Sequence, residues 1–123
     1  MDAALADRRC RPLGRETPPL LGPEVVRLLA QLDPAWGIRG GPVLVRRFAG
    51  DYPILVELAG RIGQLAQEQD HHPDIELGYG RLEVAWTTHS VGGLSMNDFV
   101  LAAKVDRLAA ETRFQAATPS AEH

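Results

Sequence analysis

The sequence contains little cysteine, no excess of positive charge and no long apolar run. Cys10 is the only cysteine among 123 residues, which excludes an internal disulfide and a cysteine-rich zinc site and fits a reducing compartment. No stretch approaches the roughly 20 apolar residues of a membrane span, and residues 1–15 lack the apolar run of a secretory signal. These absences predict a cytoplasmic protein without a membrane partner.

The balance of charge argues against a second class of partner. Thirteen lysines and arginines stand against 16 acidic residues, which gives a formal net charge of -3. Non-specific binding to a phosphate backbone needs a positive surface field, so we expect no direct contact with nucleic acid. With 45% hydrophobic residues, the chain is long enough for one domain with its own core.

The ends of the chain differ in composition from its middle. Residues 1–19 are rich in proline and charge, so we interpret them as a tail that is either laid over a surface or flexible. Residues 113–123 are polar and small, which is typical of a second flexible tail. The folded domain is therefore predicted at residues 20–112.

Three segments of that domain have apolar residues at helical spacing. They are residues 23–32, 51–67 and 95–110, and each begins with a residue suited to a helix start. Between them, residues 36–39 and 43–48 read as one hairpin, and alternating residues within 75–89 read as another. The order helix, hairpin, helix, hairpin, helix predicts an α+β fold with an antiparallel sheet and helices on one face. Such a sheet has exposed edges, so we expect a homo-oligomer.

Three histidines lie where predicted strands begin or end. His71, His72 and His89 could donate and accept protons in one turnover, because imidazole titrates near neutrality. The alternative is that His71-His72 is a solvated turn and His89 an interface residue. A zinc site is a third possibility, but it needs three or four converging ligands. No further Cys or His lies at ligand spacing, so we expect no metal.

Asp98 has two interpretations that can coexist. It stands three residues after Ser95, so it can complete a capping box at the start of the third helix. Its carboxylate can also face His89 across the glycine loop and fix the tautomer of that imidazole. Trp86, at an alternating strand position, is expected to belong to the core.

The histidines stand within a longer ordered series of motifs. The series is Gln69-Asp70-His71-His72-Pro73-Asp74-Ile75, Tyr79, Thr88-His89, Gly92-Gly93-Leu94-Ser95, Asn97-Asp98-Phe99 and Leu101-Ala102-Ala103-Lys104-Val105-Asp106. Upstream, Trp36, Arg46-Arg47-Phe48, Asp51-Tyr52 and Leu65-Ala66-Gln67-Glu68 continue it. Over roughly residues 20–112 this chain closely resembles the pterin-4a-carbinolamine dehydratase family, including its dehydratase-like members. An ordered spacing of three histidines and an aspartate is far more specific than a lone His-His-Pro.

The resemblance implies a fold and a reaction. The fold is a four-stranded antiparallel sheet with three helices packed on one face, assembled as a homodimer or homotetramer, in agreement with the order predicted above. The reaction removes water from 4a-hydroxytetrahydropterin to give quinonoid dihydropterin, which recycles the tetrahydrobiopterin cofactor of aromatic amino acid hydroxylases. The pterin is then the substrate of a hydro-lyase, and no metal or organic cofactor is implied.

The resemblance also implies roles for the site residues. His71, His72 and His89 would line the pterin pocket, with His72 as the base at N5. His71 and His89 would act on the leaving hydroxyl, with Asp98 orienting His89. Loss of the hydroxyl needs a proton while N5 gives one up, so the reaction requires imidazoles in different protonation states.

Five further residues are expected to contact the substrate, and they flank the histidines in the sequence. They are Glu68, Pro73, Asp74, Thr88 and Ser90.

Three positions depart from the family pattern. Many members have a glutamate where this chain has Gln67, and Glu68 need not replace it because one residue turns a helical side chain by about 100°. Gly50 stands where a second aromatic residue is common, and Ile75 where some members cover the pterin with an aromatic ring.

These departures keep an alternative function open. Relatives of the family act as protein partners, one class as a dimerisation cofactor of a transcription factor and another as a RuBisCO assembly factor of the alpha-carboxysome. A hydroxylase, RuBisCO or a transcription factor is therefore a possible protein partner, and the fold alone does not choose between these functions and catalysis.

Overall fold

The computed structural model describes residues 4–14 and 16–112, and the predicted tail at residues 113–123 lies outside them. Its helices are α1 (Gly22–Leu29), α2 (Tyr52–Gln69) and α3 (Met96–Glu111), with 3-10 turns η1 (Leu5–Asp7) and η2 (His89–Val91). Its strands are β1 (Gly37–Arg39), β2 (Val43–Ala49), β3 (Asp74–Gly78) and β4 (Arg81–Trp86). This order confirms the predicted α+β class.

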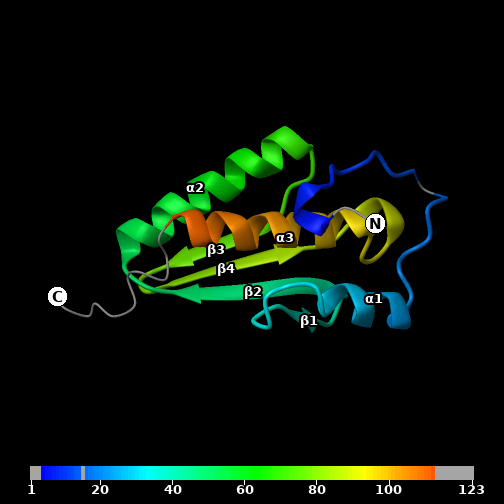
Figure 1. The fold of residues 1–123 in the computed structure, drawn as a ribbon, viewed down its shortest axis with the longest axis horizontal. Coiled ribbons are helices and arrows are strands. Elements are labelled where there is room, and N and C mark those ends of the chain that lie inside the picture. The colour runs from blue at the N-terminus through cyan, green and yellow to red at the C-terminus, as the bar shows by residue number, and fades with distance from the viewer. Residues whose placement is uncertain (1–3, 15, 113–123) are drawn as a thin grey trace.

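The strands form one antiparallel sheet in the order β1-β2-β4-β3. Each predicted hairpin pairs its own two strands, and β2 pairs with β4 along the centre, where Leu44 lies opposite Trp86. Helices α2 and α3 cover the same face of this sheet (Figure 1). Strands β1 and β3 are its two edges.

One apolar core fills the space between the sheet and the helices. On β2 and β4 every second side chain is directed into it, and the stripes of α2 and α3 complete it from above. Leu28 brings α1 into the same core. None of the described helices is long and apolar enough to cross a membrane. The fully buried members of the apolar core include Leu44, Leu55, Leu58, Ile62, Leu82, Val84, Trp86, Phe99, Leu101 and Val105.

A polar network ties three elements together at the edge of this core. The Asp106 carboxylate of α3 accepts hydrogen bonds from Arg46 of β2 at 2.6 Å and from the Trp36 indole at 2.7 Å. It also accepts the backbone N–H of Asp33 at 3.0 Å. The Arg46 guanidinium lies 4.3 Å from the centre of the Phe48 ring. These residues, which belong to the series that resembles the family, therefore join α3, β2 and the segment after α1.

The sheet face opposite the helices carries a second charged cluster. Glu83 of β4 accepts hydrogen bonds from Arg39 at 3.1 Å and from Arg47 at 3.0 Å. These two bonds hold the pKa of the Glu83 carboxyl below its ordinary value. The cluster joins three neighbouring strands across their register.

The second hairpin ends earlier than its alternating pattern predicts. Strand β4 stops at Trp86, and Thr88 makes only an isolated bridge with Gly93. Residues 89–91 then form the turn η2, which closes at Gly92 with a φ of 74°. Glycine adopts this left-handed conformation without strain, so the chain leaves the sheet here and reaches α3 within a few residues.

The N-terminal residues 4–14, called the strap below, lie against α3 (Figure 1). Leu5 of η1 is buried in the common core. The Arg107 guanidinium of α3 bonds Asp7 and holds the pKa of that carboxyl below its ordinary value. Lys104 donates to the Ala6 carbonyl at 2.9 Å.

Candidate active site

His71 is placed by the way α2 ends. Asp70 adopts a left-handed conformation with a φ of 54°, the only described non-glycine residue with positive φ. The His71 N–H then donates back to the Ala66 carbonyl of the last helical turn at 3.1 Å. This closure satisfies the end of the helix, and it fixes the backbone from which the imidazole extends.

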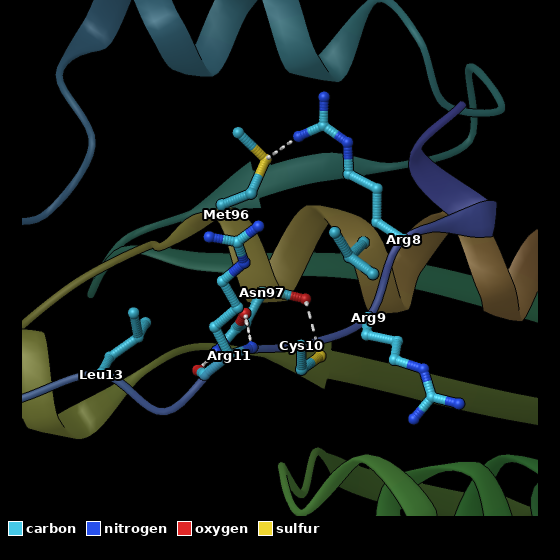
Figure 2. Close-up of a pocket in the computed structure, with 8 residues that line it drawn as sticks. Arg8, Arg9, Cys10, Arg11, Leu13, Met96 and Asn97 are labelled. Atoms are coloured by element: carbon cyan, nitrogen blue, oxygen red, sulfur yellow. Dashed lines mark hydrogen bonds between the residues drawn. The ribbon is translucent and has the colours of Figure 1, made fainter. Parts of the chain in front are cut away.

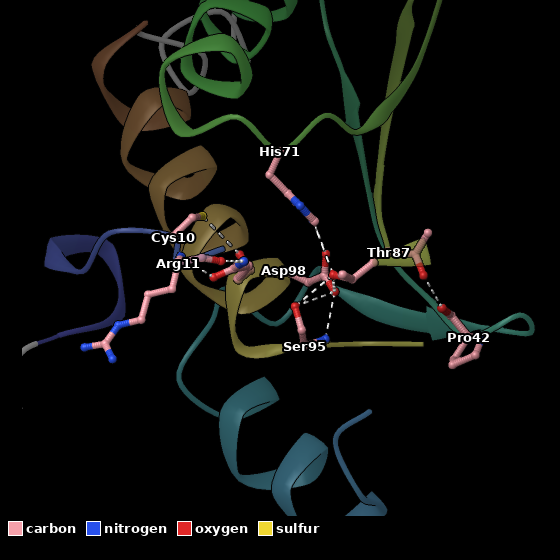
Figure 3. A network of polar contacts seen from close by, with 9 residues as sticks. Cys10, Arg11, Pro42, His71, Thr87, Ser95 and Asp98 are labelled. Atoms are coloured by element: carbon pink, nitrogen blue, oxygen red, sulfur yellow. Dashed lines mark hydrogen bonds and ion pairs between the residues drawn. The ribbon is translucent and has the colours of Figure 1, made fainter. Parts of the chain in front are cut away.

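Asp98 is placed by the way α3 begins. The Ser95 N–H donates to Asp98 Oδ2 at 2.9 Å, and Ser95 and Asp98 form the predicted capping box. The Thr88 hydroxyl donates to the same oxygen at 2.8 Å and lies 2.8 Å from the Ser95 hydroxyl. Figure 3 shows these contacts converging on one carboxylate. Asp98 is fully buried, so every donor around it is held without competition from water.

The remaining oxygen of Asp98 meets His71. His71 Nε2 lies 2.8 Å from Asp98 Oδ1, and the His71 side chain is 14% exposed. Its ring stacks on Trp86, with centroids 5.8 Å apart and planes 11° from parallel. A neutral imidazole in this position donates from Nε2 to the carboxylate, which leaves Nδ1 as the proton acceptor. The pair therefore fixes the tautomer and the orientation of the ring.

The predicted contact between Asp98 and His89 is wrong. Both Asp98 oxygens are taken by other groups, and in the described part of the chain no hydrogen bond joins His89 to Asp98. His89 lies exposed on η2, directly after the buried Thr88. The reason is that Thr88, whose side chain donates to Asp98, directly precedes His89. Successive residues of an extended segment point to opposite sides, so the place beside the carboxylate belongs to Thr88.

His72 is exposed and has its own neighbour on α2. Its Nε2 lies 3.2 Å from the side-chain oxygen of Gln67. The amide of Gln67, which stands where many relatives have a glutamate, thus contacts His72, the histidine that we assigned as the base. An amide oxygen accepts a hydrogen bond without adding negative charge, unlike the glutamate of many relatives.

The other predicted substrate-binding residues differ in burial. Glu68 lies in the last turn of α2, Asp74 begins β3 and Ser90 lies on η2, and all three are exposed. Pro73 is half-buried beside them. Thr88 is 5% exposed and directed at Asp98, so it supports the carboxylate from inside.

Sequence reasoning missed the parts that Ser95 and Trp86 play around the pair. Ser95 was expected only to cap α3, but its hydroxyl also bonds Thr88. Trp86 belongs to the core as predicted, and its ring additionally supports His71. Alternation along residues 82–88 places Trp86 and Thr88 on one face, which is the signal that could have linked them.

Metal ligation finds no support around these histidines. Within residues 4–14 and 16–112, no group of three or more His, Cys, Asp and Glu side chains gathers in a way that could hold a metal ion. The arrangement instead offers imidazoles in unlike surroundings, one held by a buried carboxylate and one beside an amide. Two imidazoles in such different surroundings suit a reaction in which one donates a proton and the other accepts one.

The fold is therefore of the α+β class, with an imidazole and a buried carboxylate brought together by the end of α2 and the start of α3. The family model described as pterin 4 alpha carbinolamine dehydratase matches residues 18–108, and the chain belongs to that family.

Similar sequences carry the corresponding name. A Rubrobacter xylanophilus protein named "Putative pterin-4-alpha-carbinolamine dehydratase" is 45% identical over 105 residues, which cover 85% of this chain and 97% of the relative. A Nitrosomonas eutropha protein of the same name is 38% identical over 104 residues, which cover 85% of this chain and 92% of the relative.

Two solved structures resemble the fold and differ in the function that their titles state. A transcriptional coactivator/pterin dehydratase from Brucella melitensis has a TM-score of 0.70 and 28% identity, covering 74% of this chain and 98% of its own. A pterin dehydratase-like protein identified as a RuBisCO assembly factor in the alpha-carboxysome has a TM-score of 0.53 and 27% identity, covering 61% and 89%.

Proposed function

We propose that this chain catalyses the loss of water from a 4a-hydroxytetrahydropterin, giving the quinonoid dihydropterin. The observation that carries the proposal is the buried pair of His71 and Asp98, held at 2.8 Å with Thr88 and Ser95 around the carboxylate. A pair so fully bonded in a family of dehydratases suits proton transfer to a leaving hydroxyl. The pterin is the substrate, and the reaction uses no cofactor or metal.

The reaction needs two proton transfers that balance. The C4a–O bond breaks as the hydroxyl takes up one proton, and N5 loses another as the C4a=N5 double bond forms, so the products are quinonoid dihydropterin and water. His71, held by Asp98 at 2.8 Å, supplies the proton to the hydroxyl, and the exposed His89 assists there. His72 takes the proton from N5.

Stopped-flow measurement of freshly generated 4a-hydroxytetrahydropterin tests the activity. We expect the wild type to exceed the uncatalysed rate by several hundredfold or more, since a positioned acid or base contributes about 100 to 10,000-fold. His71→Ala should lose this acceleration while remaining folded. A folded wild type that matches buffer would overturn the proposal.

The assignment of His72 as base has its own test. His72→Ala should slow turnover by about 100-fold, and full turnover by this variant would show that another group takes the N5 proton. Gln67→Glu replaces the amide oxygen that lies 3.2 Å from His72 Nε2 with a carboxylate oxygen. Because a carboxylate favours the protonated imidazole, the rise of turnover with pH should move to higher pH.

The cellular role that we propose is recycling of a tetrahydropterin in the cytoplasm, in support of an aromatic amino acid hydroxylase. We propose a homodimer or homotetramer as the working form, because the edges β1 and β3 leave backbone groups open to pairing. Size-exclusion chromatography with light scattering across a range of concentrations tests this assembly, and a monomer at every concentration would exclude it.

A second candidate function is protein binding. It is favoured by the likeness to the RuBisCO assembly factor and by the amide at Gln67 in place of the family's glutamate. Under this alternative a carboxysomal enzyme or a transcription factor is the partner. Retention of a stoichiometric partner on the immobilised protein after a salt wash, together with a wild type that matches the uncatalysed rate, would favour it over catalysis.

A further inference from the structure

A cavity of about 940 Å³ opens between the strap and the first turns of α3 (Figure 2). The strap contributes five lining residues, Arg8, Arg9, Cys10, Arg11 and Leu13, and α3 contributes Met96, Asn97 and Val100. Neither His71 nor Asp98 lines it. The volume is that of a small-molecule site, which runs from about 300 to 1,000 Å³.

The lining of this cavity carries charge of one sign. It holds three arginines and no carboxylate. In the described part of the chain these arginines have no ion pair, whereas Arg46 and Arg107 each bond an aspartate. Burial raises the pKa of the Cys10 thiol to about 11, so this side chain adds no negative charge at neutral pH. Three uncompensated cations thus gather on a chain whose net charge is -3.

The backbone that presents these arginines is fixed at several points. The Cys10 N–H donates to the side chain of Gln69 at 3.0 Å, and Arg11 exchanges two hydrogen bonds with the Asn97 side chain, at 3.0 and 2.8 Å. Arg8 Nη1 lies 3.7 Å from the sulfur of Met96. In Figure 2 the side chains of Arg8 and Arg11 extend towards Met96 and that of Arg9 extends away.

We propose that this cavity binds a small organic anion, with an apolar body and a terminal phosphate or carboxylate. Arg8 and Arg11 bind the anionic group, since guanidinium matches the geometry of both anions. Leu13, Met96 and Val100 contact the apolar body. Inorganic phosphate fills only a small part of the volume, which is why the ligand is organic.

The ligand has two possible sources that share this chemistry. It is either a free metabolite or an acidic side chain of the pterin itself, because Asn97 in the cavity wall is the direct neighbour of Asp98. The second source rests on the proposed dehydratase function, and the first does not.

Binding is tested on the full chain with phenyl phosphate, followed by the amide NMR shifts of Arg11, Met96 and Asn97. We expect saturation with a Kd near or below about 1 mM, and binding at least about tenfold weaker for phenol and for inorganic phosphate. No saturable shift at these amides up to about 10 mM would overturn the proposal.

Two double variants distinguish the effect of the cavity arginines on binding from the effect of the overall charge. Arg8→Gln with Arg11→Gln should weaken phenyl phosphate at least about tenfold, because two charge-assisted contacts are lost. Arg27→Gln with Arg81→Gln removes the same charge elsewhere and should leave the Kd within about twofold, as distant surface charges are screened. Equal weakening by both pairs would overturn the site.

KM measurements distinguish the two sources of the ligand. If the site serves the pterin side chain, Arg8→Gln with Arg11→Gln raises KM for a pterin with an acidic side chain and leaves KM for a neutral one unchanged. If the ligand is a separate metabolite, the double variant leaves both KM values unchanged although it weakens the binding of phenyl phosphate measured by NMR. Absence of turnover with either pterin would count against the dehydratase proposal, while the NMR result would still decide the binding site.

Discussion

The two oxygens of Asp98 have different partners. One oxygen completes the N-terminal cap of α3 and accepts the Thr88 hydroxyl, and the other faces His71. A cap alone contributes about 1 kcal/mol, and it requires no burial. This carboxylate is fully buried, so capping accounts for only one of its two oxygens and the contact with His71 occupies the other.

Asp98→Asn separates the cap from the contact with His71, because the amide oxygen can still accept the Ser95 N–H. We expect turnover to fall by about 100-fold or more, since His71 loses the carboxylate that orients it for proton transfer. The variant should remain folded by circular dichroism, which distinguishes this loss from a purely structural one. Asp7→Asn, at a surface carboxylate of the strap, is the control and should leave turnover unchanged.

At the scale of elements, the helices and hairpins could be predicted from periodicity, because each forms from a pattern within its own segment of the sequence. The stripe of α2 and the alternation of β4 are local patterns, and both elements formed, although β4 ends at Trp86, earlier than its alternation predicts. The partner of Asp98 was not predictable in this way. It depends on how the end of α2 approaches the start of α3, which is a tertiary arrangement set by the core.

The strap was even less accessible to sequence reasoning. Apart from the buried Leu5, the strap contacts the rest of the domain mainly through hydrogen bonds of the Cys10 and Arg11 backbone. Such contacts leave no hydrophobic period to detect. Gln69 and Asn97, which bond the strap, each stand within two residues of the His71 and Asp98 pair.

Asn97→Ala removes both side-chain bonds to Arg11 and should loosen the strap by about 1 to 3 kcal/mol. Because burial raises the pKa of Cys10 to about 11, the thiolate needed for alkylation is scarce while the strap is bound. Iodoacetamide at pH 8 should therefore label Cys10 faster in the variant than in the wild type. Gln64→Ala, on the exposed side of α2, is the control, and equal labelling of wild type and Asn97→Ala would contradict the prediction.

At the scale of the molecule, Asp106 joins β2, α3 and the segment after α1. Asp106→Ala leaves the Arg46 guanidinium, whose side chain is 10% exposed, without its closest anion. Breaking such a pair costs about 3 kcal/mol, which urea unfolding followed by fluorescence measures. Turnover per folded molecule should stay unchanged, since the network lies apart from His71.

The Glu83 cluster should make stability depend on pH. Its folded pKa lies below the ordinary 4.5, so the unfolded chain binds this proton first as pH falls. The stabilisation is therefore complete well above pH 4.5 and is lost as pH falls towards the folded pKa. Glu83→Gln should lower the free energy of unfolding at pH 7 and have a diminishing effect in more acidic buffer. A constant difference across that range would contradict this assignment.

The strap has one more consequence, for where this protein can be cut. The family match begins at residue 18, yet Leu5 fills part of the common core and residues 4–14 cover α3. A chain started at residue 18 would keep all the residues that the family model matches and still uncover an apolar flank of α3. The segment that the model matches is therefore shorter than the unit that folds.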